Sequence, residues 1–368
     1  MVERIDIRPE MLSWAINRSG QDVDVFLATH LEVDSWIKGE KKPTIKQLEA
    51  FAEKVHVPKG YLFLPTPPVE NIPFPVFRGN AETGHFSLNV YDTVANVGLR
   101  QSWLETYLID NELPRPMFVG SVNQSQGVCH AVSMLRSILH LEPRWAFDLK
   151  NPEFAVNKLA EQIEEAGVFI AFNGVVGSNT HRPIDVEECR GFALVSPVAP
   201  YIFVNSQDAK TAQLFTLAHE MAHLLIGVSA GHAGEIVVSH NATERFCDAV
   251  AAEFLVPADV LRTEWNTIKK CASKFKVSEL VIARRAHDLG IISDADYNEF
   301  YHSYLVRLIP SRKSSTGGDF YATSRKRIGR MFAVHVSNAV NSRQLSRIEA
   351  YRMTGLYGDT FNHFMQLV

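Results

Sequence analysis

The segment around residue 220 has the residue types and spacing of a metal-dependent hydrolase. His219 and His223 are four positions apart, and Glu220 directly follows the first histidine. On a helix, positions i and i+4 lie on one face about one turn apart, so both imidazoles can reach a single ion. The neighbouring carboxylate can then take a proton from a water at that ion. The H-E-x-x-H pattern therefore predicts a Zn²⁺ site with His219 and His223 as ligands and Glu220 as catalytic base.

The residues around this pattern decide between a metal site and an ordinary amphipathic helix with two surface histidines. Apolar residues at 217–218, 221–222 and 224–225 surround both histidines and predict a mostly buried helix. Buried imidazoles need partners, which favours the metal site. We expect Asn205 or Ser206 to cap the start of this helix and Gly227 to end it.

A third ligand is expected on the next helical segment. Glu244 lies 21 residues after His223 and begins a new helical pattern. It can complete a site of two histidines and one glutamate, which is the catalytic kind of zinc centre. Asp248 follows one turn later, where it can accept the other N–H of a ligand histidine. The alternative for both acids is a solvated helix face. Three residues between the helices have open roles: His232, Glu235 and His240.

A small sheet and several helices must position these side chains. Period-2 or continuous apolar patterns predict strands at residues 168–172, 191–195 and 201–204. Helical periodicity predicts helices at 90–110, 131–141 and 152–166. The strand at 201–204 precedes the motif helix, so we expect it to offer its edge to an extended substrate.

The remaining parts of the chain are predicted to be helical. Residues 1–56 have the pattern of four or five short helices, and six prolines between positions 58 and 75 mark an extended connector. The predicted organisation is therefore an α+β core flanked by helical domains. Its parts are a helical domain at 1–60, a Pro-rich linker at 61–80, a metallopeptidase domain at 81–260 and a basic helical domain at 261–368.

The charge is distributed unevenly. Residues 261–368 carry 17 Lys and Arg against 9 Asp and Glu, whereas residues 61–260 have a net charge of −11. The basic part can contact nucleic acid or an acidic partner, or it can dock onto the acidic middle of the same chain. Its best electrostatic candidates for nucleic acid or a partner are Arg325, Lys326, Arg327 and Arg330.

Composition excludes a membrane protein and indicates a reducing compartment. The sequence has no run of roughly 18 apolar residues and no apolar segment near its start that resembles a secretory signal. Its four cysteines form no C-x-x-C pair, which argues against a disulfide framework or a thiolate zinc site. We expect a cytoplasmic protein.

The motif helix and the segment E-x-x-C-D-A-V-A-A-E-F-L-V-P at 244–257 resemble the ImmA/IrrE family of metallo-endopeptidases. Cys247, Asp248 and Val250 stand where that family usually has Ala, Asn and Phe. Residues 36–44 and 60–65 resemble the Xre-type helix-turn-helix of longer members. Residues 317–321 and 351–361 resemble the tail of those members.

The resemblance implies a zincin-like core that cleaves a regulatory protein such as a repressor or an antitoxin. The alternative is an Xre-type transcriptional regulator or antitoxin in which the peptidase fold holds a partner toxin. An intact Glu220 favours the enzyme. Residues 1–60 have a net charge of −1, so binding of DNA and contact with protein, including a second copy in a homodimer, both stay open.

Overall fold

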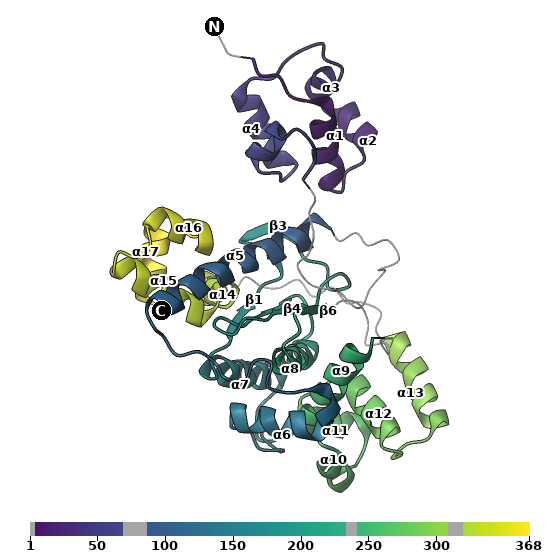
Figure 1. Cartoon of the computed structure of the whole chain (residues 1–368). Coiled ribbons are helices and arrows are strands. Elements are labelled where there is room, and N and C mark those ends of the chain that lie inside the picture. The colour runs from purple at the N-terminus through teal and green to yellow at the C-terminus, as the bar shows by residue number, and fades with distance from the viewer. Residues whose placement is uncertain (1–3, 69–86, 233–240, 308–318) are drawn as a thin grey trace. The chain divides into compact units, whose positions relative to one another are not determined.

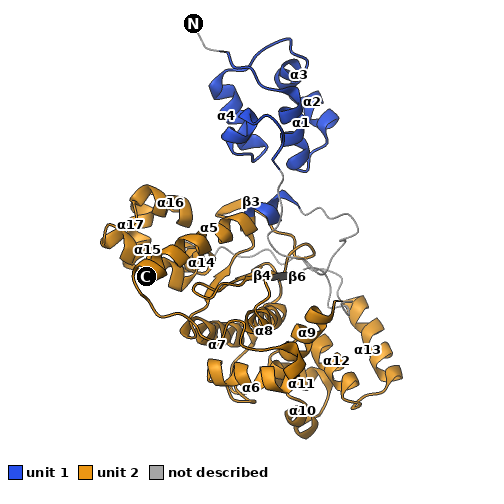
Figure 2. Ribbon diagram, viewed as in Figure 1, with its two compact units in different colours: residues 1–73, 85–92 blue, residues 74–84, 93–368 orange. Residues whose placement is uncertain are grey.

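The computed structural model describes residues 4–68, 87–232, 241–307 and 319–368 (Figure 1). Contacts divide the chain into two compact units (Figure 2). Unit 1 comprises Met1–Pro73 and His85–Asp92, and unit 2 comprises Phe74–Gly84 and Thr93–Val368.

Unit 1 is a cluster of short helices, as predicted. Its helices are α1 (Pro9–Arg18), α2 (Val23–Thr29), α3 (Leu31–Ile37), α4 (Ile45–Lys54) and the 3₁₀ helix η1 (Lys59–Phe63). Asp22 caps α2, and Thr44 forms a capping box with Gln47 at the start of α4. The buried side chains of Trp36, Phe51 and Leu62 meet in one core. Leu62 therefore places η1 in this core, although the sequence assigned residue 61 onward to the linker.

The central sheet of unit 2 has four strands in the order β1-β5-β4-β6. They are β1 (Phe169–Phe172), β4 (Gly191–Leu194), β5 (Tyr201–Val204) and β6 (Ala230–His232). β5 is parallel to β1 and antiparallel to β4. β5 is thus paired on both sides, so the expectation that it offers a free edge to a substrate is wrong. A separate hairpin joins β2 (Val175–Val176) and β3 (Asn179–Pro183).

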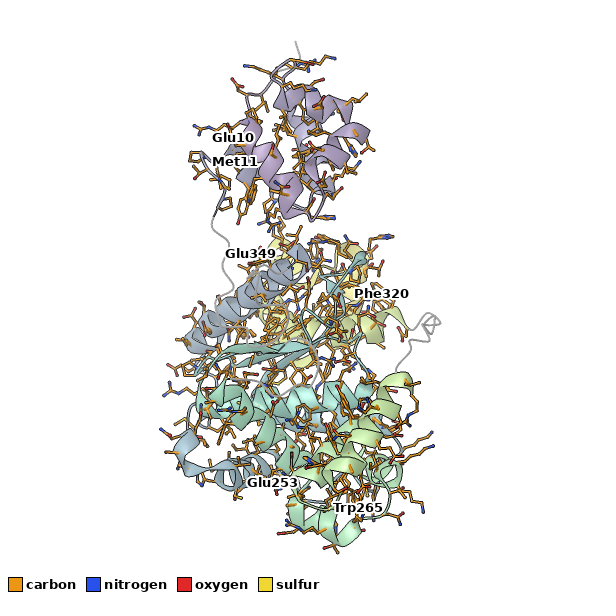
Figure 3. All side chains as sticks on the ribbon, turned by 90° about the vertical axis from the view of Figure 1, so that its right-hand side faces the viewer. Glu10, Met11, Glu253, Trp265, Phe320 and Glu349 are labelled. Carbon is orange, nitrogen blue, oxygen red and sulfur yellow. The ribbon has the colours of Figure 1, made fainter. Side chains whose placement is uncertain are left out.

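One face of the sheet is covered by α7 and α8, which lie below it in Figure 1. Ile170, Ala193 and Ile202 from the sheet pack there against Leu214 and Leu217 of α8. Side chains fill the space between the sheet and these helices (Figure 3). The helices that belong to this side are η2 (Gln124–Gln126), α6 (Val128–Leu139), α7 (Pro152–Glu165), α8 (Lys210–Ile226), α9 (Ala242–Leu255), α10 (Ala258–Glu264), α11 (Ile268–Phe275), α12 (Glu279–Asp288) and α13 (Asp294–Arg307).

The same hydrophobic core continues past residue 260, where the sequence predicted a domain boundary. Leu261, Phe275 and Ile282 of α10, α11 and α12 are buried in the core that also contains α8 and α9. The predicted limits of separate domains within unit 2 stay predictions.

The opposite face of the sheet is covered by α14 (Phe320–Ile328) and α15 (Arg330–Asn341), which contact β1. On the same side in Figure 1 lies α5 (Leu88–Asp110), whose Gln101 amide donates to the Leu194 and Ala199 carbonyl oxygens. The helices α16 (Arg347–Thr354) and α17 (Gly358–Gln366) pack on α15. Gly329 joins α14 to α15 with φ +93°, and a Cβ there would lie 2.4 Å from the Ile170 carbonyl oxygen. The junction of α14 and α15 therefore contacts the backbone of β1 directly. No helix among the described residues is long and apolar enough to cross a bilayer.

Candidate metal centre

The motif helix α8 begins later than the sequence indicated. Its N-cap is Ala209, which makes no side-chain cap, so the expected cap by Asn205 or Ser206 is wrong. The Asn205 amide is used within the preceding loop, where it donates to the carbonyl oxygens of Ile184 and Cys189 at 3.1 and 2.9 Å. The end of α8 is as predicted, because Gly227 terminates it in the left-handed conformation with φ +72°.

The second helix, α9, places Glu244 in its first turn, as expected. Asn241 caps this helix by accepting hydrogen bonds from the backbone N–H groups of Thr243 and Glu244. The cap fixes where α9 starts and therefore which of its side chains face α8.

The two helices bring three donor groups together in the core. The Nε2 atoms of His219 and His223 are 3.1 Å apart. The Glu244 carboxylate lies 3.3 Å from His219 Nε2 and 2.9 Å from His223 Nε2. All three donor atoms lie within 4.8 Å of one another, and all three side chains are buried. Two imidazoles and a carboxylate are a ligand set that suits Zn²⁺, and burial of this polar group is favourable when a cation joins it.

Asp248 lies behind the first histidine, one turn along α9. Its Oδ1 atom is 3.1 Å from His219 Nδ1. When Nδ1 carries the ring proton and donates a hydrogen bond to this carboxylate, Nε2 is unprotonated. The lone pair of Nε2 is then directed at the other donors. Burial lowers the pKa of His219, but Asp248 and Glu244 raise it more, to about 10. The surroundings thus stabilise a positive charge at this position, which a proton or a metal ion can supply.

Glu220 is fully buried beside the donor cluster. Burial raises the pKa of its carboxyl group to about 8, and Glu244 adds to the increase. His219 and the backbone N–H of Ala193 act in the opposite direction. A carboxyl group in this range can gain or lose a proton near neutral pH, as a general base must.

Gly191 on β4 contributes to the packing around Glu220, and the sequence did not reveal this role. A Cβ at this position would lie 2.5 Å from Thr216 Cγ2, 2.7 Å from the Phe203 carbonyl oxygen and 3.7 Å from Glu220 Oε1. Glycine therefore lets α8 approach the sheet where Glu220 meets it. The only sequence signal was a glycine at a strand position, which often marks a close approach of another segment.

The other predicted site residues lie elsewhere or outside the described residues. The basic residues at 325–327 and 330 line a cavity to which none of the metal donors contributes. His232 ends β6, whereas Glu235 and His240 lie outside the described residues, as do Gly317 and Gly318.

Residues 164–287 match the Peptidase M78 family model, described as the IrrE N-terminal-like domain. This part of the chain is similar to a metallopeptidase-family domain. The matched segment runs from the end of α7 to α12 and contains all three donors and Glu220. It supports the predicted resemblance to the ImmA/IrrE family for these residues, and it does not include the N-terminal helices.

A second family model, a domain of unknown function (DUF8813), matches residues 328–366. No curated protein and no solved structure matches the chain.

Proposed function

We propose that the protein is a zinc-dependent endopeptidase whose metal is held by His219, His223 and Glu244. The observation that carries this proposal is the convergence of three buried donor atoms within 4.8 Å, in a segment that matches a metallopeptidase family. Three protein ligands leave a fourth position of a tetrahedral ion open, which is typical of catalytic zinc.

The chain's own residues then have distinct tasks. When bound, zinc supplies Lewis acidity that polarises a peptide carbonyl and lowers the pKa of a water. Glu220 takes the proton of the attacking water and delivers it to the nitrogen of the leaving amine. Asp248 holds the His219 ring in one tautomer and one orientation through Nδ1.

We propose that the substrate is a regulatory protein, such as a repressor or an antitoxin, as the resemblance to the ImmA/IrrE family implies. An extended segment of it can add to an edge of the sheet. In the described sheet, β1 and β6 are the edge strands, and the junction at Gly329 lies against β1. β6 is therefore the strand that we assign to substrate pairing in place of β5.

A second candidate function is an Xre-type regulator or antitoxin that binds DNA or a toxin. The short consecutive helices α2 and α3 favour it, although His30 alone separates them, which is shorter than the turn of about three to four residues in a helix-turn-helix. However, the first turn of α3 contains Glu32 and Asp34, and Lys38 is paired with Asp34 at 2.7 Å. Phosphate binding needs free cations, so this helix suits a protein partner better than DNA.

Metal analysis tests the proposed ligands. Purified protein should contain about one zinc ion per chain, because one His₂Glu site holds one ion. Alanine in place of His219, His223 or Glu244 should each lower the zinc content, whereas His130→Ala, an exposed histidine on α6, should leave it unchanged. Full zinc content in Glu244→Ala would show that the third ligand is another residue.

A further inference from the structure

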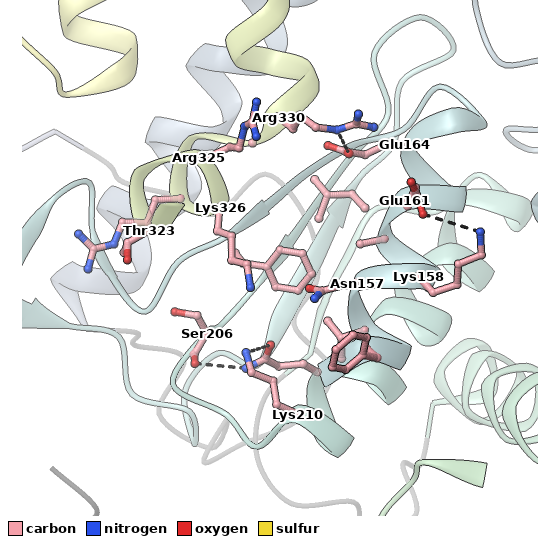
Figure 4. Close-up of a pocket in the computed structure, with 18 of the residues that line it drawn as sticks. Asn157, Lys158, Glu161, Glu164, Ser206, Lys210, Thr323, Arg325, Lys326 and Arg330 are labelled. Carbon is pink, nitrogen blue, oxygen red and sulfur yellow. Dashed lines mark hydrogen bonds and ion pairs between the residues drawn. The ribbon is translucent and has the colours of Figure 1, made fainter. Parts of the chain in front are cut away.

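A cavity of about 650 Å³ lies between α7, the first turn of α8 and α14 (Figure 4). We call it the α14 cavity. Its volume falls within the range of small-molecule sites, roughly 300–1,000 Å³. None of the three metal donors lines it, and neither does Glu220. The α14 cavity is therefore distinct from the candidate metal centre.

Lys210 of α8 and Lys326 of α14, here called the lysine pair, enter the α14 cavity from two elements. Figure 4 shows Lys326 directed towards the side where Lys210 and Ser206 lie. Lys210 Nζ has a neutral partner, Gln213 Oε1, at 3.1 Å. Burial lowers the pKa of Lys210, the nearby charge of Lys326 lowers it further, and the charge of Glu153 acts in the opposite direction. An anion between the two ammonium groups would relieve this repulsion.

Two other cations of the α14 cavity are paired with carboxylates. Arg330 contacts Glu164 at 2.9 Å, and Lys158 contacts Glu161 at 3.7 Å. For Lys326 the carboxylate partner is Glu153, at 3.8 Å. The described lining has six cationic side chains, among them the lysine pair, Arg325 and Arg327, against two carboxylates, so the α14 cavity has a net positive charge.

The rest of the cavity wall is largely apolar. Phe154 and Phe172 contribute aromatic rings, and Ile170, Val156 and Leu149 contribute aliphatic surface. Half of the Phe154 side chain is exposed, at 50%. The α14 cavity thus joins a cationic end to an apolar and aromatic body.

We propose that the α14 cavity binds a phosphate monoester with an aromatic or apolar body, of about nucleotide size. The phosphate lies between the lysine pair, and the body contacts Phe154 and Phe172. A monoester carries nearly two negative charges at neutral pH, which match two ammonium groups, and lysine binds phosphate as a point charge. A nucleic-acid strand fits less well, because Glu161 and Glu164 interrupt the basic surface.

Calorimetric titration of the full chain with 1-naphthyl phosphate tests this inference, which does not depend on the peptidase proposal. The wild type should bind this probe, and should bind 1-naphthol and inorganic phosphate at least about tenfold more weakly, because each lacks half of the recognised chemistry. Lys210→Met and Lys326→Met should each weaken binding about tenfold or more, since each removes a charged partner. Lys210→Arg, which keeps the charge, should retain most of the affinity.

The control is Lys269→Met, which removes an exposed lysine of α11 that does not line the cavity and should bind like the wild type. All variants should keep the zinc content and the melting temperature of the wild type. Absence of binding to the wild type would overturn the inference, as would equal affinity for 1-naphthol or unchanged affinity in both methionine variants. Binding of a single-stranded oligonucleotide without binding of 1-naphthyl phosphate would also overturn it and indicate a nucleic-acid surface.

Discussion

The contact between α8 and β4 at Gly191 should be sensitive to a single methyl group. In Gly191→Ala, the new Cβ would lie 2.5 Å from Thr216 Cγ2 and 2.7 Å from the Phe203 carbonyl oxygen. Both distances are far below van der Waals contact, and one partner is backbone that cannot rotate away. Thr216 belongs to α8 and Phe203 to β5, so β4 must shift relative to α8 and to β5, and a shift of α8 would move Glu220 with it.

Overpacking of this kind typically costs about 1–3 kcal/mol. For a unit of this size, a cost of 1 kcal/mol lowers the melting temperature by about 2–4 °C. Thr216→Ser removes Cγ2 but keeps the hydroxyl group, so it relieves one of the two overlaps. The double variant should therefore lose less stability than the sum of the two single changes, by about 0.5 kcal/mol or more.

Chemical denaturation of the metal-free protein, monitored by circular dichroism, measures these differences. Gly98→Ala is the matched control, because a Cβ there meets nothing within 4 Å, and alanine is the better helix former on α5. That control should be as stable as the wild type or more so. A Gly191→Ala variant with unchanged stability would refute the close packing that we assign to β4 and α8.

Two further predictions concern individual side chains. Asp248→Asn should weaken zinc binding by about 10- to 100-fold, because the amide orients the His219 ring less well than the carboxylate does, and a competition titration with a chelator measures this loss. For His335, burial lowers the pKa of the folded protein below 6.5, so the unfolded chain binds a proton more readily. The stabilisation that the neutral ring contributes is complete above about pH 6.5, the pKa of the unfolded chain. It is lost as the pH falls from there through the lower pKa of the folded protein. Replacing His335, which contacts Tyr107 and Phe169, by Phe should therefore flatten the decline in unfolding free energy between about pH 7 and about pH 5. An unchanged slope would contradict the half-buried, neutral ring.

The donor cluster could be predicted because most of its geometry is local. The spacing of His219 and His223 on one helix face follows from the helical repeat alone. Glu244 required a second helix to pack against the first, and the sequence predicted that Glu244 begins this helix, whereas the Asn241 cap was found in the structure. The metal ligands are thus set by two helices whose inward faces the sequence indicates.

Features that depend on non-local pairing could not be predicted in the same way. The apolar pattern identified the strand at Tyr201–Val204 but not its neighbours, because strand order follows from contacts between distant segments. The cap of α8 was misassigned because the Asn205 amide bonds to Ile184 and Cys189 instead. The lysine pair shares no motif, and its two members line one cavity only because α14 packs against β1, across the cavity from the first turn of α8.

The most direct test of the central claim compares protein N-termini in native cells that express the wild type or Glu220→Gln. The variant should keep its zinc, since Glu220 acts on the water and is not a ligand, and should lose about 10²–10⁴-fold in cleavage rate. We predict that mass spectrometry finds new N-termini of one or a few regulatory proteins with the wild type and none of them with the variant. Identical N-termini in both, with equal zinc content, would contradict the assignment of Glu220 as catalytic base and favour a fold that only holds a partner.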